Sequence, residues 1–209
     1  MKKFVSAAMF ALLAIAPLMA QSPKGWKVRV DKSTDAADPD GAGDIKFVTS
    51  GSGFQATNPQ AAVYWNPANT ATGNYSLKGT FTLLKPSGHT NYYGLVFGGS
   101  DLGAAGQSYI YFLVAQNGTW LIKRRDGEAT QNVAAKTPND VVKKPDASGM
   151  STNALEVRVL ADKIEFVING TVVTTLPKTG QTAKTDGIYG IRVNHLLEVK
   201  IEGLSVSKL

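Results

Sequence analysis

Short runs of alternating apolar and polar residues recur along the chain after residue 20, and helical periodicity is almost absent. The runs are rich in Val, Ile, Tyr, Phe and Thr, and Gly, Asn, Asp and Pro separate them, which is typical of strands joined by turns. The pattern predicts strands at 26–30, 45–49, 53–57, 62–65, 75–84, 92–97, 109–116, 119–124, 155–160, 164–168, 171–176, 188–193 and 197–206. This many short strands predicts an all-β sandwich or barrel.

The clearest turn signal is Asn169-Gly170, between the strands predicted at 164–168 and 171–176. Both central residues of a type I′ turn need φ > 0, which Asn and Gly tolerate. The sequence therefore predicts a tight hairpin at this point.

The hairpin before it can be checked by the parity of its apolar residues. A two-residue loop at Ala161-Asp162 pairs Arg158 with Glu165 and keeps the apolar residues of both strands on one face. An unbulged three-residue loop would split those faces between core and solvent. We therefore expect the even loop, with a surface ion pair between the Arg and the Glu.

The first twenty residues have the composition of a secretory signal peptide. Lys2 and Lys3 precede an apolar run at 4–18, and Ala20 offers a small residue for cleavage. That run is shorter than the roughly 20 residues that span a bilayer. We expect a secreted or periplasmic protein with no membrane span in its mature form and a single β-sandwich domain over residues 21–209.

The amino-acid composition excludes several classes of site and partner. The chain has no Cys, which removes disulfides, thiolate metal sites and Cys nucleophiles. Lys and Arg number 22 against 16 Asp and Glu, a formal net charge of +6. Nucleic-acid binding needs clustered charge with aromatic platforms, and the densest basic cluster is only the three residues 123–125. We expect no nucleic-acid partner, and the sequence leaves the oligomeric state open.

Several segments resemble known sandwich proteins. Residues 91–97 (NYYGLVF), 109–114 (YIYFLV) and 118–124 (GTWLIKR) resemble the central strands of concanavalin A-like (lectin/glucanase, laminin-G-like) domains. Residues 187–195 (GIYGIRVNH) and 199–204 (VKIEGL) resemble the closing strands of their 3-keto-disaccharide hydrolase subgroup. The resemblance covers residues 75–209 and implies a concanavalin A-like jelly-roll sandwich of two curved antiparallel sheets.

The resemblance also implies that a sugar, where bound, lies on the concave sheet. Strand alternation sends a set of polar and aromatic side chains to the outward surface of these strands, where rings can stack on a sugar while amides and cations bond its hydroxyls. Alternatively these are ordinary strand exteriors, because Tyr is favoured in strands anyway. The expected ligand-binding residues are Tyr92, Tyr109, Tyr111, Lys123, Arg125, Arg192 and Asn194.

Candidate catalytic groups are few. A glycoside hydrolase normally uses two carboxyls about 5 to 9.5 Å apart, whereas Glu198 and Glu202, four strand residues apart, are separated by roughly 13 Å. His195 falls where the 3-keto-disaccharide subgroup tends to have a His, which makes it the candidate catalytic base, or else a plain turn residue. We assign no role to His89, and no nucleophile elbow is present.

An acidic segment near the N-terminus is a candidate calcium loop. Asp38, Asp40 and Asp44 are closely spaced and separated by Gly turns, which suits a hard cation with oxygen ligands. An EF-hand would need an acidic residue at its twelfth position, where Thr49 stands. We therefore expect no cofactor and a solvated acidic turn, with a calcium ion as the alternative.

We therefore expect an exported carbohydrate-binding or accessory domain. One alternative is a glycoside hydrolase acting on modified (3-keto) disaccharides, and another is a structural or adhesive surface domain. A pocket that holds His195 beside a carboxylate would favour the enzyme, and an open aromatic groove the binding domain. A flat outer face would favour the structural domain.

Overall fold

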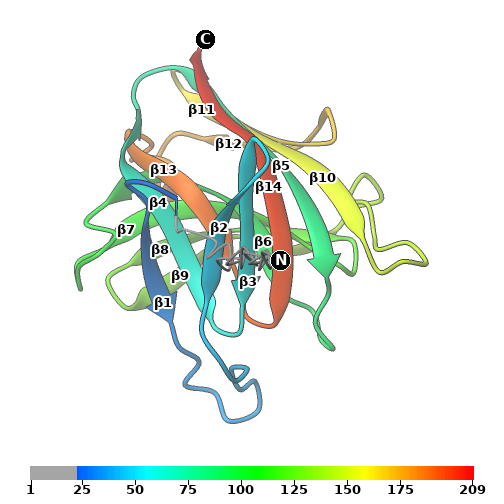
Figure 1. The fold of residues 1–209 in the computed structure, drawn as a ribbon. Helices are drawn as coiled ribbons and strands as arrows, with labels where there is room; N and C mark the ends of the chain where they lie inside the picture. The colour runs from blue at the N-terminus through cyan, green and yellow to red at the C-terminus, as the bar shows by residue number, and fades with distance from the viewer. Residues whose placement is uncertain (1–22) are drawn as a thin grey trace, which may run out of the picture.

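The computed structural model describes residues 23–209 as two antiparallel seven-stranded sheets packed face to face (Figure 1). The predicted signal peptide at residues 1–20 lies outside the described residues. Sheet A has the order β1-β4-β13-β6-β7-β8-β9, and sheet B has the order β12-β11-β10-β5-β14-β3-β2. Among residues 23–209, no helix has the length and apolar character needed to cross a membrane.

The strands of sheet A are β1 (Lys27–Asp31), β4 (Ala61–Ala71), β6 (Tyr92–Ser100), β7 (Ser108–Ala115), β8 (Thr119–Asp126), β9 (Ala129–Pro138) and β13 (Gly187–Val193). Those of sheet B are β2 (Lys46–Ser50), β3 (Gly53–Asn58), β5 (Tyr75–Lys85), β10 (Ser151–Val159), β11 (Lys163–Ile168), β12 (Thr171–Pro177) and β14 (Leu197–Lys208). A single 3₁₀ turn, η1, spans Gly180–Thr182 in this part of the chain. The all-β sandwich predicted from the alternation is confirmed.

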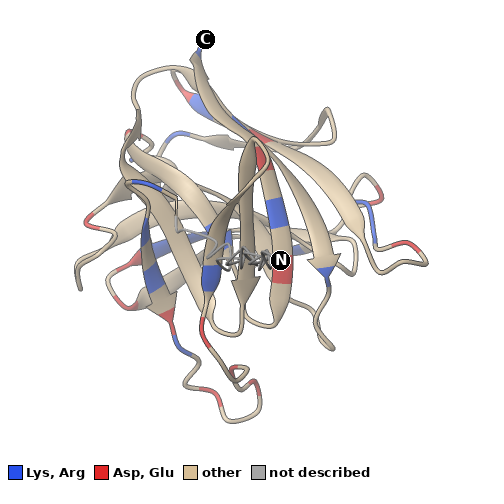
Figure 2. Cartoon of the chain, in the orientation of Figure 1, with Lys and Arg blue, Asp and Glu red and all other residues tan. Residues whose placement is uncertain are grey.

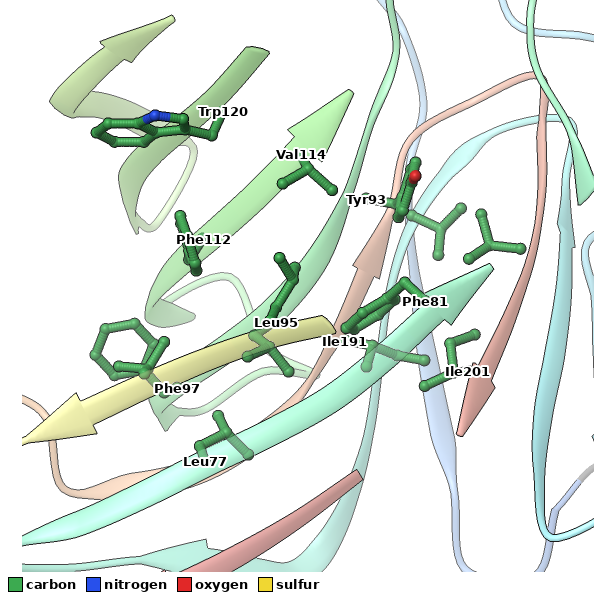
Figure 3. Packing of buried hydrophobic residues seen from close by; sticks show 14 of the residues in the cluster. Leu77, Phe81, Tyr93, Leu95, Phe97, Phe112, Val114, Trp120, Ile191 and Ile201 are labelled. Carbon is green, nitrogen blue, oxygen red and sulfur yellow. The ribbon is translucent and has the colours of Figure 1, made fainter. Parts of the chain in front are cut away.

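The core fills the space between the two sheets (Figure 3). Leu77 and Phe81 of β5 face Leu95 of β6 and Phe112 of β7, because successive strand side chains point to opposite faces. The Phe112 ring meets the Phe166 ring of the opposite sheet edge-on, with centroids 5.2 Å apart. Complete burial of one such side chain contributes about 1.5–3 kcal/mol, so this contact layer joins the sheets.

Both predicted hairpins are present as expected. Asn169 and Gly170 have φ values of 50° and 85°, which is the primed turn. Arg158 pairs in register with Glu165, and their closest charged atoms are 3.6 Å apart. This register confirms the predicted two-residue loop at Ala161-Asp162.

The sequence pattern did not predict β9, because residues 129–138 lack the alternation of the other strands. This strand pairs only with β8 at the edge of sheet A, and its first four residues are exposed. An edge strand held by backbone hydrogen bonds needs no apolar face of its own, so its alternation is absent from the sequence. Its place matters because it borders the candidate site.

Candidate functional site

The outer face of sheet A points away from the core and carries the predicted tyrosines. Tyr92, Tyr109 and Tyr111 lie there in a second buried apolar cluster, whereas Ile110 and Phe112 lie in the core. The alternation is therefore correct. The expectation that these rings lie open on the surface is wrong, because Tyr109 is 0% exposed and Tyr111 only 6%.

A surface connection explains this burial. The β6–β7 connection, residues 101–107, sends Leu102 into the same apolar cluster. Arg29 of β1 holds the connection by donating to the Ala104 carbonyl at 2.7 Å. Arg29 also pairs with Glu128 of the adjacent β8–β9 turn at 3.0 Å. Alternation gives the face on which a side chain lies, but not whether another segment covers it.

Arg125, predicted to bind a ligand, takes part in this cover. Its guanidinium donates to the Gly127 carbonyl at 2.7 Å and pairs with Glu128 at 2.9 Å. Tyr109 lies beneath the cover, where its hydroxyl accepts a 3.1 Å hydrogen bond from Arg192. Neither residue lines the hollow that the remaining predicted ligand-binding side chains surround, although Tyr109 contacts two of them, Arg192 and Tyr111.

Those remaining side chains surround a hollow of about 320 Å³ on the outer face, here called the sheet A hollow. Leucine and tyrosine side chains form its apolar part, and amides and cations surround them. The sheet A hollow is lined by Asp38, Thr90, Asn91, Tyr92, Tyr111, Leu113, Leu121, Lys123, Thr130, Lys136, Arg192 and Asn194. It thus brings together five of the seven residues predicted from the sequence.

Arg192 is a fixed part of this hollow rather than a mobile contact. Its guanidinium forms an ion pair with Asp31, and both side chains are 11% exposed. The guanidinium carbon also lies 5.4 Å from the centre of the Tyr111 ring. Burial raises the pKa of the Tyr111 hydroxyl above its ordinary value, so the ring stays neutral beside the cation.

Two lysines give the hollow unbalanced positive charge. Lys123 and Lys136 have no carboxylate within 4.0 Å among the described residues. The Lys136 ammonium lies 5.6 Å from the centre of the Tyr92 ring. Burial, with repulsion from Lys136 and Arg192, lowers the pKa of Lys123 below its ordinary value. An anionic ligand would offset this repulsion.

Both histidines of the chain meet at one end of the hollow. His195 lies in the β13–β14 connection, His89 in the β5–β6 connection, and Asp38 in the β1–β2 connection, along which Figure 2 shows several acidic positions. The two Nε2 atoms are 3.1 Å apart, and Asp38 Oδ1 lies 2.8 Å from that of His89 and 3.1 Å from that of His195. Asp40 Oδ1 lies 3.1 Å from Nδ1 of His195.

Sequence reasoning missed His89, because its partner is 106 residues away and no local motif joins them. Its connection is held by Gln116, which donates to the carbonyls of Ser87 and His89 at 2.8 and 3.0 Å. His195 is followed by Leu196 with φ of 57°, a conformation that is uncommon for a non-glycine residue. A strained residue next to a buried histidine is the kind of feature found at functional sites.

The predicted calcium ligands separate into two places. Asp38 and Asp40 lie with His195, whereas Asp44 lines another hollow, of about 610 Å³, together with Lys46. Asp40 also accepts a 2.8 Å hydrogen bond from the Ser33 backbone amide. A solvated acidic turn, with calcium as its alternative, stays the prediction for this segment.

The acidic residues of β14 are occupied elsewhere. Glu198 accepts a 2.6 Å hydrogen bond from Gln55, and Glu202 pairs with Lys200 at 2.9 Å. Neither lines the sheet A hollow.

No protein-family model matches this sequence, and no curated protein matches it. Solved structures do resemble the fold. The carbohydrate-binding module CBM66 from Bacillus subtilis has a TM-score of 0.62 at 14% identity, over 88% of this chain and 96% of the module. The chain has a concanavalin A-like jelly-roll fold.

Two further structures support this fold. A Bacillus subtilis protein of unknown function with a galectin-like fold has a TM-score of 0.60 at 14% identity, covering 88% of this chain and 90% of its own. Alginate lyase A1-II′, of polysaccharide lyase family 7, has a TM-score of 0.52 at 14% identity, covering 88% and 94%. The fold prediction is thereby confirmed, and membership of the 3-keto-disaccharide hydrolase subgroup stays a prediction.

Proposed function

We propose that this protein is an exported carbohydrate-binding or accessory domain and that the saccharide binds in the sheet A hollow. The observation that carries this proposal is the hollow itself, in which ammonium and amide donors surround a small apolar floor. A saccharide offers many hydroxyl acceptors and one apolar ring face, which such a site complements. The carbohydrate-binding module that shares the fold supports the same function.

The burial of the tyrosines changes how such a site would bind. Tyr111 is 6% exposed and Tyr92 only 3%, so neither ring offers a broad stacking platform. Recognition then depends on hydrogen bonds and charge, with Lys123, Lys136 and Asn194 as the donors. Hydrogen bonds to charged groups contribute about 1.5–3 kcal/mol each, which fits micromolar to millimolar affinity.

The two unpaired lysines favour an acidic saccharide, one that carries carboxylate or sulfate groups. Calorimetric titration with uronic acid oligosaccharides, beside neutral oligosaccharides of the same length, tests this preference. Lys123→Ala with Lys136→Ala should weaken the binding of the acidic series at least ten-fold. Lys208→Ala is the matched control, because that exposed lysine lies on β14 in the opposite sheet.

Equal affinity of the wild type and the double lysine variant would refute the assignment of the hollow. Failure of every saccharide to bind would refute the function. The export that we propose is tested by intact mass of the exported protein, which should begin near Gln21. A species that retains Met1 would contradict it.

A second candidate function is a glycoside hydrolase acting on 3-keto-disaccharides, and one observation favours it. His195 is 5% exposed, contacts Asp40 through Nδ1, and borders a small hollow of about 160 Å³ that Asp38 and Asn91 share with the sheet A hollow. A carboxylate that orients a histidine is a common arrangement for a general base. Release of the free 3-keto sugar, abolished by His195→Gln, would support this activity.

A further inference from the structure

We propose that Asp38, His89 and His195 bind a divalent first-row transition metal ion at the end of the sheet A hollow. This site goes beyond the proposed function, because it rests on these three side chains whether or not a saccharide occupies the hollow. It also differs from the calcium site predicted from the sequence, since two of its three ligand atoms are imidazole nitrogens. Among the described residues, this is the group of histidine and carboxylate side chains whose ligand atoms converge.

The distances between the ligand atoms fit a metal ion. The two histidine Nε2 atoms and the Asp38 Oδ1 atom form a triangle with sides of 2.8, 3.1 and 3.1 Å. An ion about 2.1 Å from each ligand places adjacent octahedral ligands ~3.0 Å apart and tetrahedral ligands ~3.4 Å apart. The observed sides match three ligands on one face of an octahedron.

Such a face leaves the opposite coordination positions open. Two histidines and one carboxylate in this facial arrangement are a recurring site for divalent transition metals. Calcium takes six to eight oxygen ligands, so a pair of imidazoles disfavours it. The chemistry of the donors therefore selects an ion of the class of Zn²⁺, Co²⁺ or Fe²⁺.

The surroundings of His195 fit the same role. Its Nδ1 atom lies 3.1 Å from Asp40 Oδ1, and the other oxygen of that carboxylate accepts the Ser33 amide at 2.8 Å. A metal-binding histidine commonly donates its second ring N–H to a carboxylate, which turns the lone pair of the other nitrogen toward the metal. Asp40 is thus a positioning residue that holds the ring rather than a ligand.

The arrangement of hydrogen-bonding atoms gives an independent reason. With the Nδ1 proton of His195 donated to Asp40, its Nε2 atom and Asp38 Oδ1 are both acceptors at 3.1 Å. If His89 Nε2 carries a proton, it can donate a hydrogen bond to one of these two acceptors. That proton would then face the Asn91 amide nitrogen, which is also a donor and lies 3.0 Å from the same Nε2 atom. A cation at the centre of the triangle satisfies all three ligand atoms at once, and the Asn91 amide then donates to Ser87 Oγ, 3.2 Å away, instead of to the single lone pair of His89 Nε2.

The test is metal titration of the protein purified without a polyhistidine tag and stripped with a chelator. Co²⁺ absorbs visible light when bound by imidazole and carboxylate, so the spectrum reports the ligands directly. Zn²⁺ binding is measured by calorimetry and by competition against Co²⁺. We expect one ion per chain with a dissociation constant below about 10 µM.

His89→Gln and Asp38→Asn should each weaken Zn²⁺ binding at least ten-fold and remove the Co²⁺ absorption. Both side chains are nearly half exposed, at 44% and 48%, so the variants should keep the thermal midpoint measured in chelator. Asp40→Asn should weaken binding about 10–100-fold while keeping the Co²⁺ spectrum, as a positioning residue does. Asp44→Asn is the matched control and should change nothing, because Asp44 lies in another hollow.

Absence of Zn²⁺ and Co²⁺ binding up to 1 mM, on the order of a non-specific affinity, would overturn the proposal. Binding that is unchanged by His89→Gln would overturn it equally. Binding of Ca²⁺ that falls with Asp44→Asn and ignores His89→Gln would replace it with the carboxylate site predicted from the sequence.

Discussion

Arg192 can act either as a structural cation or as a ligand contact, and the two roles predict different results on mutation. The sequence places it among the ligand contacts, but the structure pairs it with Asp31 at 11% exposure of each side chain. Removal of one partner of a buried ion pair costs about 3–5 kcal/mol, and the lower end applies here because Arg29 Nε still lies 3.7 Å from Asp31. The cation–π contact with Tyr111 adds about 0.5–2 kcal/mol at a partly desolvated site.

We therefore expect Arg192→Met, which keeps most of the side-chain volume, to destabilise the protein by about 4 kcal/mol. With a urea m-value of about 2–3 kcal/mol/M, the unfolding midpoint should fall by roughly 1.3–2 M. Arg192→Met combined with Asp31→Leu should recover much of that loss, since an apolar pair is a common substitute for a buried ion pair. Urea unfolding of the two single variants and the double variant measures the coupling directly.

The opposite result would refute this reasoning. If Arg192→Met leaves the midpoint unchanged and only weakens saccharide binding, the guanidinium is a ligand contact and its pairing with Asp31 contributes little. If the double variant is as unstable as the sum of the single variants, the two side chains are not energetically coupled.

Three other perturbations test the structure. Tyr111→Ala should cost about 3–5 kcal/mol in a denaturant titration, as for other buried aromatic residues, while Tyr111→Phe should cost far less. An unchanged midpoint for the alanine variant would mean that the ring is not packed. Gly170→Val should cost at least about 1 kcal/mol, because a β-branched residue resists a φ of 85°, and Gly106→Val is its control at a position with equal space and no positive φ. Burial alone would raise the pKa of Glu156, but hydrogen bonds from Arg158 and Ser76 outweigh burial, so the pKa is lowered. The ionised Glu156 therefore stabilises the fold fully above the ordinary Glu pKa of about 4.3, and this stabilisation is lost as the pH falls further. Thermal midpoints from pH 7 to 3 should therefore fall less steeply in Glu156→Gln, and equal slopes would contradict this.

Much of the fold could be predicted from the sequence, because alternation and turn chemistry are local. The hairpin at Asn169-Gly170 needs two adjacent residues with φ > 0, and the pairing of Arg158 with Glu165 follows from parity across a short loop. β9 could not be predicted, since an edge strand is held by its backbone. The packing of residues 101–107 over Tyr109 could not be predicted either, because the sequence of this connection has no pattern that indicates which surface it covers.

The convergence of Asp38, His89 and His195 follows from strand direction, which the sequence does not give. β1 and β13 are both antiparallel to β4, so they run in the same direction, and their last residues lie at the same end of sheet A. β6 is antiparallel to β13, so its first residue lies at that same end of the sheet. The β5–β6 connection, which comes from sheet B, must therefore reach this end as well.

Each of the three residues thus lies on a connection that crosses between the sheets at one end of the sandwich. Connections at a shared end are free to carry polar side chains, because the core does not select their composition. A histidine without any local motif, such as His89, becomes interpretable only when the strand order shows which other connections it meets. The same rule gives a direct search in related folds, where histidines and carboxylates on these three crossings would be the first candidates for a metal site.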